Sequence, residues 1–445
     1  GGDDTITDDQ GSNLIHGGSG NDQLTSRSLA GDHNLSGGSG NDHLTATGLS
    51  IQLDGNEGND RLYAYGYIQR DSSESFVKQG NAILNGDIGN DNLQIYRYST
   101  ASASGGEGND TLYGAYSRDV SLYGEQGNDR LEIYTVSWSS QQTDDNQYAP
   151  QIHLLDGGDG NDELKISGYS YRYEGRTDLW LNGGSGEDLI TVTEQLAGAQ
   201  NNGYDHGFAT ATIDAGPDND HISIAGVLQA TITTGLGQDT IELTNQQFQT
   251  LLEGSRALET GNGTRVNINP ELTIITDFTT GPTGDILDYG DLLRNGTLTY
   301  DGSNPFASGF LSLEQAGNDT HLRFDPDGSS NTQHSPTLIA VLQNTNANLF
   351  SSDNFNPNFP TDGSAAAGQA INGTDSNNNL TGSFGNDTIL GFDGTDTIDA
   401  QAGSDSIHGG DGNDSIEGNF GNDTIYGDGG DDTITDDQGS NLIHG

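Results

Sequence analysis

The sequence predicts an all-β fold, a parallel β-roll or β-solenoid with a small β-rich capping module. Two observations lead to this prediction. A nine-residue repeat runs without insertion from residue 373 to residue 444, and a related turn motif recurs through the first half of the chain, often 18 to 20 residues apart. The composition agrees, since the 445 residues include 67 glycines and 51 aspartates, which are typical of tight turns.

The charge of the chain limits its partners. The 66 acidic residues outnumber the 14 basic ones and give a net charge of −52. Such a surface repels phosphate backbones and anionic lipids, so we expect neither nucleic-acid binding nor membrane insertion. The absence of cysteine excludes disulfides and thiolate metal sites. The sequence also lacks methionine and an N-terminal leader, so we expect that residue 1 is not a natural start.

The nine-residue repeat is clearest near the C-terminus. Its eight blocks read GTDSNNNLT, GSFGNDTIL, GFDGTDTID, AQAGSDSIH, GGDGNDSIE, GNFGNDTIY, GDGGDDTIT and DDQGSNLIH. The eighth position is always Leu or Ile, which predicts an inward residue in a short strand. The sixth position is aspartate in six blocks, at Asp387, Asp396, Asp405, Asp414, Asp423 and Asp432. Two blocks make one flattened coil, and stacked coils place each aspartate beside a neighbouring turn.

Aspartate carboxylates and turn carbonyls are the oxygen ligands that calcium prefers. The blocks match the pattern GGxGxDxUx, and the segment therefore resembles the repeats-in-toxin (RTX) family, whose parallel β-roll binds calcium in its turns. The resemblance implies that the motif aspartates are calcium ligands.

The same turn recurs upstream, with spacings close to one whole coil. Its aspartates are Asp22, Asp42, Asp60, Asp91, Asp110, Asp129, Asp162, Asp188, Asp220 and Asp239. We expect one edge of this region to hold calcium turns and the other to hold ordinary turns or the insertions Gln69–Gly80, Ser139–Pro150 and Ala197–Phe208. Together with the six downstream turns, this predicts on the order of 16 Ca²⁺ ions.

The pattern divides the chain into five parts. We expect a regular roll at 1–45, an asymmetric roll with one calcium edge at 46–242, a β-rich cap at 243–356, a linker at 357–370 and a regular roll at 371–445. Residues 245–255 are the best candidate for a short helix.

The cap has a resemblance of its own. The segments ITDFTTGPTGDILDYGDLL, NPFASGFLSLEQAGNDTHLRFDPDGSS and LIAVLQNTNANLFSSDNF look like the C-terminal module of type I secreted RTX proteins, including serralysin-like proteases. About 90 residues follow it here, so a terminal secretion signal is not expected. In DPDG, Asp325 and Asp327 are candidates for one more calcium site, with a simple Asp-Gly turn as the alternative.

Tyrosines gather in the middle of the chain, where 13 of the 17 lie between residues 63 and 173. Strand alternation predicts that most face outward. The set is Tyr63, Tyr65, Tyr67, Tyr96, Tyr98, Tyr113, Tyr134, Tyr169, Tyr171 and Tyr173. Such a row could stack on sugar rings or pack against another copy, or loops could cover it as a second small core.

The sequence contains none of the common catalytic motifs. HExxH, GxSxG, a P-loop and a cysteine nucleophile are all missing, and only two lysines are present. The best catalytic candidate is the cluster Arg172, Glu174, Arg176 and Asp178, which is better explained as a solvated loop. We therefore predict no enzymatic activity.

The two ends of the chain carry the same 17 residues. Gly1–Gly17 reads GGDDTITDDQGSNLIHG, and Gly429–Gly445 repeats it letter for letter at an offset of 428 residues. The simplest interpretation is a tandem array of such units that joins one roll to the next, with noncovalent docking of duplicated ends as the alternative.

The leading functional hypothesis is a secreted bacterial structural or adhesive protein, in a fibre that folds when calcium arrives outside the cell. Its main partner is then another copy of itself, with extracellular polysaccharide as a further candidate. The alternatives are a carbohydrate-binding adhesin module that uses the outward tyrosines, or the noncatalytic part of a secreted RTX enzyme.

Overall fold

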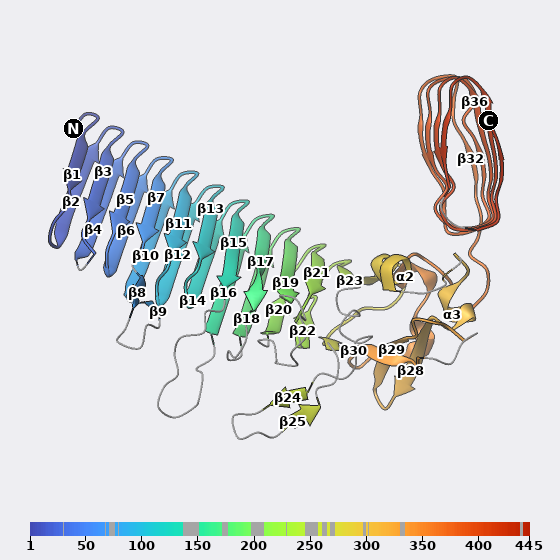
Figure 1. Cartoon of the computed structure of the whole chain (residues 1–445), viewed down its shortest axis with the longest axis horizontal. Helices are drawn as coiled ribbons and strands as arrows, with labels where there is room; N and C mark the ends of the chain where they lie inside the picture. The colour runs from blue at the N-terminus through green and yellow to red at the C-terminus, as the bar shows by residue number, and fades with distance from the viewer. Residues whose placement is uncertain are drawn as a thin grey trace. The chain divides into compact units, whose positions relative to one another are not determined.

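The chain forms two compact units in the computed structural model, Gly1–Phe278 (unit 1) and Thr279–Gly445 (unit 2). Figure 1 shows the run of parallel strands in unit 1 and the stacked coils at the C-terminal end of unit 2. The structure describes the whole chain except residues 30, 67, 71–75, 79, 137–150, 171–176, 197–208, 228, 245–256, 260–264, 268–271, 297–299, 301, 330–333 and 437–438.

Unit 1 is a β-roll built from two parallel sheets, which confirms the predicted fold class. Its strands in sheet A are β1 (Thr5–Asp8), β3 (Gln23–Arg27), β5 (His43–Thr47), β7 (Arg61–Tyr65), β11 (Asn92–Tyr96), β13 (Thr111–Ala115), β15 (Arg130–Val136), β17 (Glu163–Ser170), β19 (Leu189–Leu196), β21 (His221–Ala225) and β23 (Thr240–Leu243).

The strands of sheet B alternate with these along the chain. They are β2 (Asn13–Ser19), β4 (Asp32–Ser39), β6 (Ser50–Glu57), β10 (Asn81–Ile88), β12 (Thr100–Glu107), β14 (Asp119–Gln126), β16 (Gln151–Asp159), β18 (Thr177–Ser185), β20 (Ala209–Asp214), β22 (Gln229–Thr233) and β26 (Leu272–Ile275). Each coil therefore runs along a strand of sheet B, through a motif turn, along a strand of sheet A and through a variable connection.

The core of unit 1 lies between the two sheets, because alternate residues of each strand point inward. One inward row in sheet A pairs Leu62, Leu93, Leu112, Leu131 and Leu164 in register, and all five side chains are fully buried. Parallel pairing places like residues side by side, so a leucine at one repeat position becomes a continuous apolar row.

The variable edge contains the insertions. The first includes a two-stranded hairpin of β8 (Ile68–Arg70) and β9 (Phe76–Lys78), and a later one contains β24 (Ala257–Glu259) and β25 (Arg265–Asn267). The other two predicted insertions and the predicted helix at 245–255 lie, wholly or mostly, outside the described residues. The roll also extends beyond the predicted boundary at residue 242, because β26 returns to pair with β22.

The cap in unit 2 is a small mixed module. Its elements are β27 (Ile286–Asp288), α2 (Gly290–Gly296), α3 (Pro305–Ser308), β28 (Leu311–Ala316), β29 (Asp319–Phe324), β30 (Thr337–Leu342), η1 (Ala347–Leu349), η2 (Ser352–Asn354) and β31 (Phe355–Asn356). Strands β28, β29 and β30 form an antiparallel meander. The predicted linker packs on this module, since Asn304 Nδ2 donates to the carbonyls of Pro360 (2.8 Å) and Ser364 (2.7 Å), and Phe359 is buried.

The C-terminal roll follows, with two narrow parallel sheets. One contains β32 (Ala370–Asn372), β34 (Thr388–Leu390), β36 (Ser406–Asp411), β38 (Thr424–Gly429) and β40 (Leu442–His444), and the other β33 (Asn379–Thr381), β35 (Thr397–Asp399), β37 (Ser415–Glu417) and β39 (Thr433–Thr435). Strands pair 18 residues apart, so two nine-residue blocks make one coil. The buried core is a stack of single isoleucines with one alanine, Ala400.

Candidate metal sites

The motif turns of unit 1 all join a strand of sheet B to the next strand of sheet A, and so they form one continuous edge. The second and fourth positions of the turn require positive φ, as at Gly38 (φ 117°) and Gly40 (φ 125°). Glycine adopts these angles without the steric penalty that a Cβ would bring. The turn can therefore reverse the chain within a few residues and bring its aspartate back toward its own first residue.

The first glycine of the motif serves a different purpose, which is close approach. A Cβ built on Gly409 would lie 2.5 Å from Asp414 Oδ2 and 2.8 Å from the carbonyl oxygen of Gly427, one coil further on. A carboxylate oxygen and a carbonyl oxygen thus converge on the same small space. Ala215, Thr234 and Ala400 occupy this position in three other turns, so the backbone can shift to admit a side chain there.

The motif aspartates form a hydrogen-bonded ladder along each edge. The Asp42 N–H donates to Asp60 Oδ1 (2.6 Å), and the Asp91 N–H donates to Asp110 Oδ1 (2.7 Å). The same bond joins Asp396 to Asp414 (2.8 Å) in the C-terminal roll. One carboxylate oxygen of each aspartate is therefore held by the backbone of the preceding coil, which fixes the direction of the other oxygen.

That second oxygen, Oδ2, is buried without a hydrogen-bond partner at most motif positions. The residues are Asp22, Asp42, Asp60, Asp91, Asp110, Asp129, Asp162, Asp188, Asp220, Asp396, Asp405, Asp414 and Asp423. A buried carboxylate oxygen with no partner is unfavourable, and a bound cation would remove the penalty. The motif aspartates therefore fit the calcium sites that their sequence pattern predicts.

The electrostatics of the edge lead to the same conclusion. Burial raises the pKa of Asp60, Asp110 and Asp162 to about 7, and repulsion from neighbouring carboxylates adds to the shift. Burial also raises the pKa of Asp405 to about 7, and that of Asp220 to about 8. Without a cation, these carboxyls would hold protons near neutral pH, whereas calcium would favour their ionised form.

A second ladder at the fifth motif position was not anticipated from the sequence. The Asn59 N–H donates to Asn41 Oδ1, and the Asn90 N–H donates to Asn59 Oδ1, both at 2.8 Å. This ladder runs opposite to the aspartate ladder, because here each side chain accepts from the following coil. The signal was present in the repeated letters GND, where asparagine precedes the motif aspartate.

The last motif turn of unit 1 is closed by Asp277. The parallel register places Asp277 opposite Thr234, where the next coil would have its first glycine. Asp277 Oδ1 accepts from the Thr234 N–H (2.9 Å), and Asp277 Oδ2 accepts from the Gly235 N–H (3.0 Å). A side chain thus replaces the backbone of a further coil. Sequence reasoning missed this role because Asp277 lies outside the repeat.

Three predicted motif ligands do not belong to the set named above for an unpartnered Oδ2. Both oxygens of Asp387 accept hydrogen bonds, Oδ1 from the Gln369 N–H and the Ser383 hydroxyl and Oδ2 from the Ser383 N–H. Asp432 is only half-buried, and its Oδ1 accepts from the Asp414 N–H (3.0 Å). Asp239 Oδ1 accepts from the Asp220 N–H (2.8 Å).

Asp325 and Asp327 in the cap form a local turn. Asp325 Oδ1 accepts from the Asp327 N–H (3.3 Å), and Asp327 Oδ2 accepts from the His334 N–H (3.2 Å). Burial raises the pKa of Asp325 to about 6. These contacts are those of the alternative Asp-Gly turn, and a calcium ion there stays a prediction.

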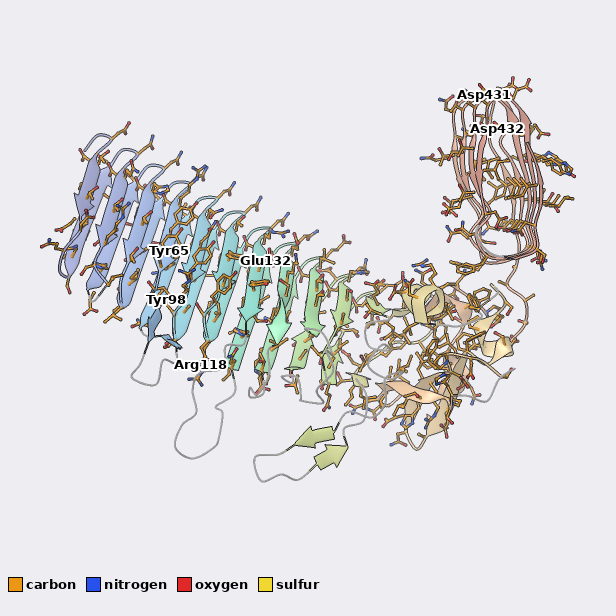
Figure 2. The ribbon with its side chains drawn as sticks, viewed as in Figure 1. Tyr65, Tyr98, Arg118, Glu132, Asp431 and Asp432 are labelled. Carbon is orange, nitrogen blue, oxygen red and sulfur yellow. The ribbon has the colours of Figure 1, made fainter. Side chains whose placement is uncertain are left out.

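Carboxylates alone do not make the sites. Within the described part of the chain, no three His, Asp or Glu side chains converge to hold a metal ion. A calcium ion at a motif turn would therefore take one carboxylate and several backbone carbonyls, as the sequence suggested. Figure 2 marks one such turn by Asp431 and Asp432 at the edge of the C-terminal roll.

The outward tyrosines are confirmed in part. Tyr63, Tyr96, Tyr113 and Tyr134 are partly exposed, and Tyr65 is 38% exposed. The prediction for Tyr98 is wrong, since its side chain is fully buried. Arg97 adopts φ 69° at the preceding position, so the chain turns and strand alternation no longer applies. Tyr67, Tyr171, Tyr173 and the side chain of Tyr169 lie outside the described residues.

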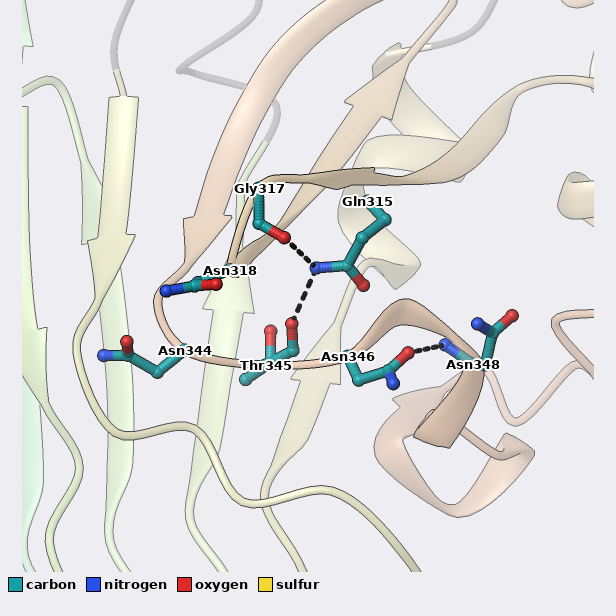
Figure 3. Close-up of a pocket in the computed structure, with 7 residues that line it drawn as sticks. All are labelled: Gln315, Gly317, Asn318, Asn344, Thr345, Asn346 and Asn348. Atoms are coloured by element: carbon teal, nitrogen blue, oxygen red, sulfur yellow. Dashed lines mark hydrogen bonds between the residues drawn. The ribbon is translucent and has the colours of Figure 1, made fainter.

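The catalytic candidate lies mostly outside the described residues. Arg172, Glu174 and Arg176 lie outside the described residues, and Asp178 Oδ1 accepts from the Thr210 hydroxyl (2.8 Å) across two strands of sheet B. A cavity of about 490 Å³ in the cap is lined by amides and Thr345, without a titratable side chain (Figure 3). Some of these amides support turns, since Gln315 Nε2 donates to the carbonyls of Gly317 (3.3 Å) and Thr345 (3.1 Å).

Comparison with known proteins agrees with this geometry. The family model of the RTX calcium-binding nonapeptide repeat matches residues 1–28, 29–48, 52–66, 104–132, 372–407, 399–434 and 408–443. The chain carries RTX calcium-binding repeats on a parallel β-roll. No curated protein matches the sequence. No helix among the described residues is long and apolar enough to cross a membrane.

Proposed function

We propose that the RTX repeats make this chain a calcium-dependent structural or adhesive protein outside the cell, one unit of about 428 residues in a tandem fibre. The repeats support calcium binding at the motif turns. The finer proposal, a continuous fibre, is carried by one observation: the two identical end segments make complementary halves of one set of contacts.

The N-terminal copy bonds to the coil that follows it. The Asp4 N–H donates to Asp22 Oδ1 (2.7 Å), and Asp3 Oδ1 accepts from the Asn21 N–H (2.8 Å). In the C-terminal copy, Asp432 occupies the position of Asp4, and it bonds to the coil before it. Its Oδ1 accepts from the Asp414 N–H (3.0 Å). Each copy therefore uses one side of the same coil.

A single copy placed at a junction would use both sides. Asp42 illustrates such an interior position, because its N–H donates to Asp60 Oδ1 and its Oδ1 accepts from the Asp22 N–H, each at 2.6 Å. The last coil of one unit would then be the first coil of the next. The ladder of Asp396, Asp414 and Asp432 would continue through the junction into the ladder of unit 1, and so would both sheets.

Burial of the apolar side chains supports the same arrangement. Ile443 is 46% exposed in the C-terminal copy, whereas Ile15, the same residue of the repeat, is 7% exposed where a following coil covers it. A following unit would bury Ile443 in the same way. Full burial of an exposed aliphatic side chain stabilises by about 1.5–3 kcal/mol, and the half-exposed Ile443 would gain about half of that. The junction would thus be stabilised by apolar packing as well as by its ladders.

Calcium binding would restrict the folding and assembly of the chain to the outside of the cell. A chain with a net charge of −52 and few apolar residues is disfavoured as a compact fold when calcium is scarce, as it is in the cytosol. About one ion at each of the predicted motif turns would reduce the net charge to roughly −20. Folding would then follow secretion into a medium that supplies calcium.

The test is the mass of the native material after calcium removal under denaturing conditions. A covalent array predicts species far above the 46.7 kDa of this chain. A single species near that mass would refute the tandem array. Electron microscopy separates the alternatives further, because fibres that form from chains of this mass in calcium, and disperse in chelator, would identify noncovalent docking of the duplicated ends.

A further inference from the structure

A stripe of tyrosines lies on the outer face of sheet A, and the fibre proposed above does not account for it. The tyrosine stripe consists of Tyr63, Tyr65, Tyr96, Tyr113, Tyr116 and Tyr134, on or directly after β7, β11, β13 and β15. Tyr65 and Tyr96 stack with centroids 5.2 Å apart and planes at 8°. Tyr96 packs against Tyr113 at 5.7 Å, and Tyr116 against Tyr134 at 5.6 Å.

The fold itself does not require these rings. In parallel register, Tyr63 follows Thr45 and Tyr65 follows Thr47 at the upstream end. At the downstream end, the row of Tyr134 continues through Ser167 to Thr193. The same outward positions are therefore filled by small hydroxyl residues in neighbouring coils of the same roll, which form equally regular strands. Among the side chains of sheet A in unit 1 that the structure describes, the tyrosine rings lie on or directly after four successive strands, β7, β11, β13 and β15.

The stripe lies on the solvent side of the sheet. The inward residues of these strands, such as Leu93 and Ile95, are fully buried, and the tyrosines alternate with them. Tyr65 begins its row and is 38% exposed. Figure 2 shows the places of Tyr65 and Glu132 on unit 1. The other five tyrosines are partly exposed. A cluster of aromatic side chains that reaches solvent in this way is a candidate binding surface.

The charges around the stripe indicate the chemistry of the partner. Glu132 accepts from Arg130 and pairs with Lys165 (3.4 Å), and Arg130 also pairs with Glu163. These basic groups are thus already neutralised by carboxylates on the same face. The net charge of −52 repels an anionic polymer in addition.

Arg61 is exposed on the same face of β7 as Tyr63 and Tyr65. The Tyr96 hydroxyl donates to Gln94 Oε1 (2.8 Å), and Gln94 Nε2 donates to Asn92 Oδ1 (2.9 Å). Otherwise the surface offers phenol rings, the other phenol hydroxyls and threonine hydroxyls.

We propose that the tyrosine stripe binds an extended, uncharged polysaccharide that runs along the roll axis. Phenol rings offer apolar surface to the C–H groups of a sugar, while protein hydroxyls bond to its hydroxyls. Neighbouring strands lie about 4.8 Å apart. This spacing is close to the length of one sugar residue in an extended chain, so successive coils can contact successive sugars.

The experiment uses the full chain, folded in calcium, and measures retention on insoluble uncharged polysaccharides such as cellulose and chitin. We compare the native sequence with Tyr65→Thr combined with Tyr96→Thr, since threonine fills the equivalent position upstream. The matched control is Tyr123→Thr, because Tyr123 is a partly exposed tyrosine on the opposite sheet. Circular dichroism and calcium stoichiometry verify that all three proteins are folded.

We expect the double variant to bind at least about tenfold more weakly, equivalent to about 1.4 kcal/mol, and the Tyr123→Thr control to bind like the native chain. Equal binding by the double variant would overturn the proposal. So would retention only on an anionic polymer such as polygalacturonate. A loss of lateral self-association in sedimentation, with no saccharide binding by the native chain, would assign the stripe to a second copy instead. These readouts are independent of the tandem array.

Discussion

The two rolls of this protein use the same motif turn, but they differ in how many such turns each coil has and in how many apolar residues each strand buries. In unit 1 each coil has one motif turn, and its strands are mostly five to eight residues long with two or three inward positions. In the C-terminal roll most strands have three residues and one inward isoleucine, and both edges carry motif turns. The narrow coil thus has more motif turns and less apolar burial than the wide one.

The difference shows in the edge ladders. One ladder of the C-terminal roll joins Asp387, Asp405 and Asp423, and the other joins Asp396, Asp414 and Asp432. Unit 1 has a single aspartate ladder, while its other edge is free to carry connections of variable length. A motif turn on both edges forbids insertions, and a motif turn on one edge permits them. The variable edge of unit 1 is therefore where new surface can be added without disturbing the metal sites.

Calcium removal should have the largest effect, and it should affect the rolls unequally. We expect chelation to unfold the C-terminal roll completely, because a stack of single isoleucines cannot offset buried, unpartnered carboxylates. The backbone amides in parts of unit 1 should stay protected from hydrogen exchange at the same chelator concentration. Hydrogen exchange measured by mass spectrometry checks this by comparing peptides from 388–435 with peptides from 92–134. Simultaneous loss of protection in both would show that the apolar core of unit 1 adds nothing.

Removal of two motif aspartates from successive coils should show how far each roll depends on its motif turns. We expect Asp414→Ala with Asp432→Ala to melt the C-terminal roll locally and to lower the calcium stoichiometry by about two. Asp110→Ala with Asp129→Ala should lower it equally in unit 1 but leave the fold intact, because long strands hold the neighbouring coils. Titration calorimetry gives the stoichiometry and circular dichroism the fold.

The matched controls are the same pairs changed to asparagine. Asparagine keeps an oxygen for the ladder hydrogen bond and removes the charge. If the asparagine variants bind as many ions as the native chain, the carboxylates are not ligands.

The pH dependence of the calcium-free protein should follow the raised pKa values. Asp60, Asp110 and Asp162 rise from the ordinary 3.8 to about 7 in the folded state. A folded-state pKa above the unfolded value adds stability that is complete below about pH 3.8 and is lost as the pH rises through about 7. In chelator, unit 1 should thus be more stable to urea at pH 5 than at pH 8. Saturating calcium should abolish or reverse this trend, since it favours the ionised form.

The surface ion pairs of sheet A should have the smallest effect on the free energy of unfolding. Glu132 pairs with Lys165 and Arg130 on an exposed face, where such pairs contribute about 0.2–1 kcal/mol. We expect Glu132→Gln to lower the free energy of unfolding in calcium by no more than that, with a smaller effect at high salt. Urea unfolding at two salt concentrations measures it. A loss of several kcal/mol would mean that the paired charges support the roll itself.

Much of the candidate site was predictable because its requirements are local. Asp42 and Asp110 were identified from their place in the turn, and Leu62 and Leu93 as inward residues from their distance to that turn. The Tyr98 prediction failed because alternation assumes a straight strand, whereas Arg97 bends the chain. Asp277 could not be recognised, because its importance comes from its position opposite Thr234, 43 residues away.

The sequence by itself determined the length of the coil, the position of each motif turn and the apolar rows, since these depend on backbone angles and on a repeat that parallel pairing converts into rows. Only the tertiary structure decided which carboxylate oxygen is bonded and which is left for a cation. The physical reason is that the bonding N–H belongs to another coil, 18 to 33 residues away along the chain. The tertiary structure likewise decided that the two identical end segments expose opposite sides of one coil. This difference in contacts is the basis of the proposed assembly.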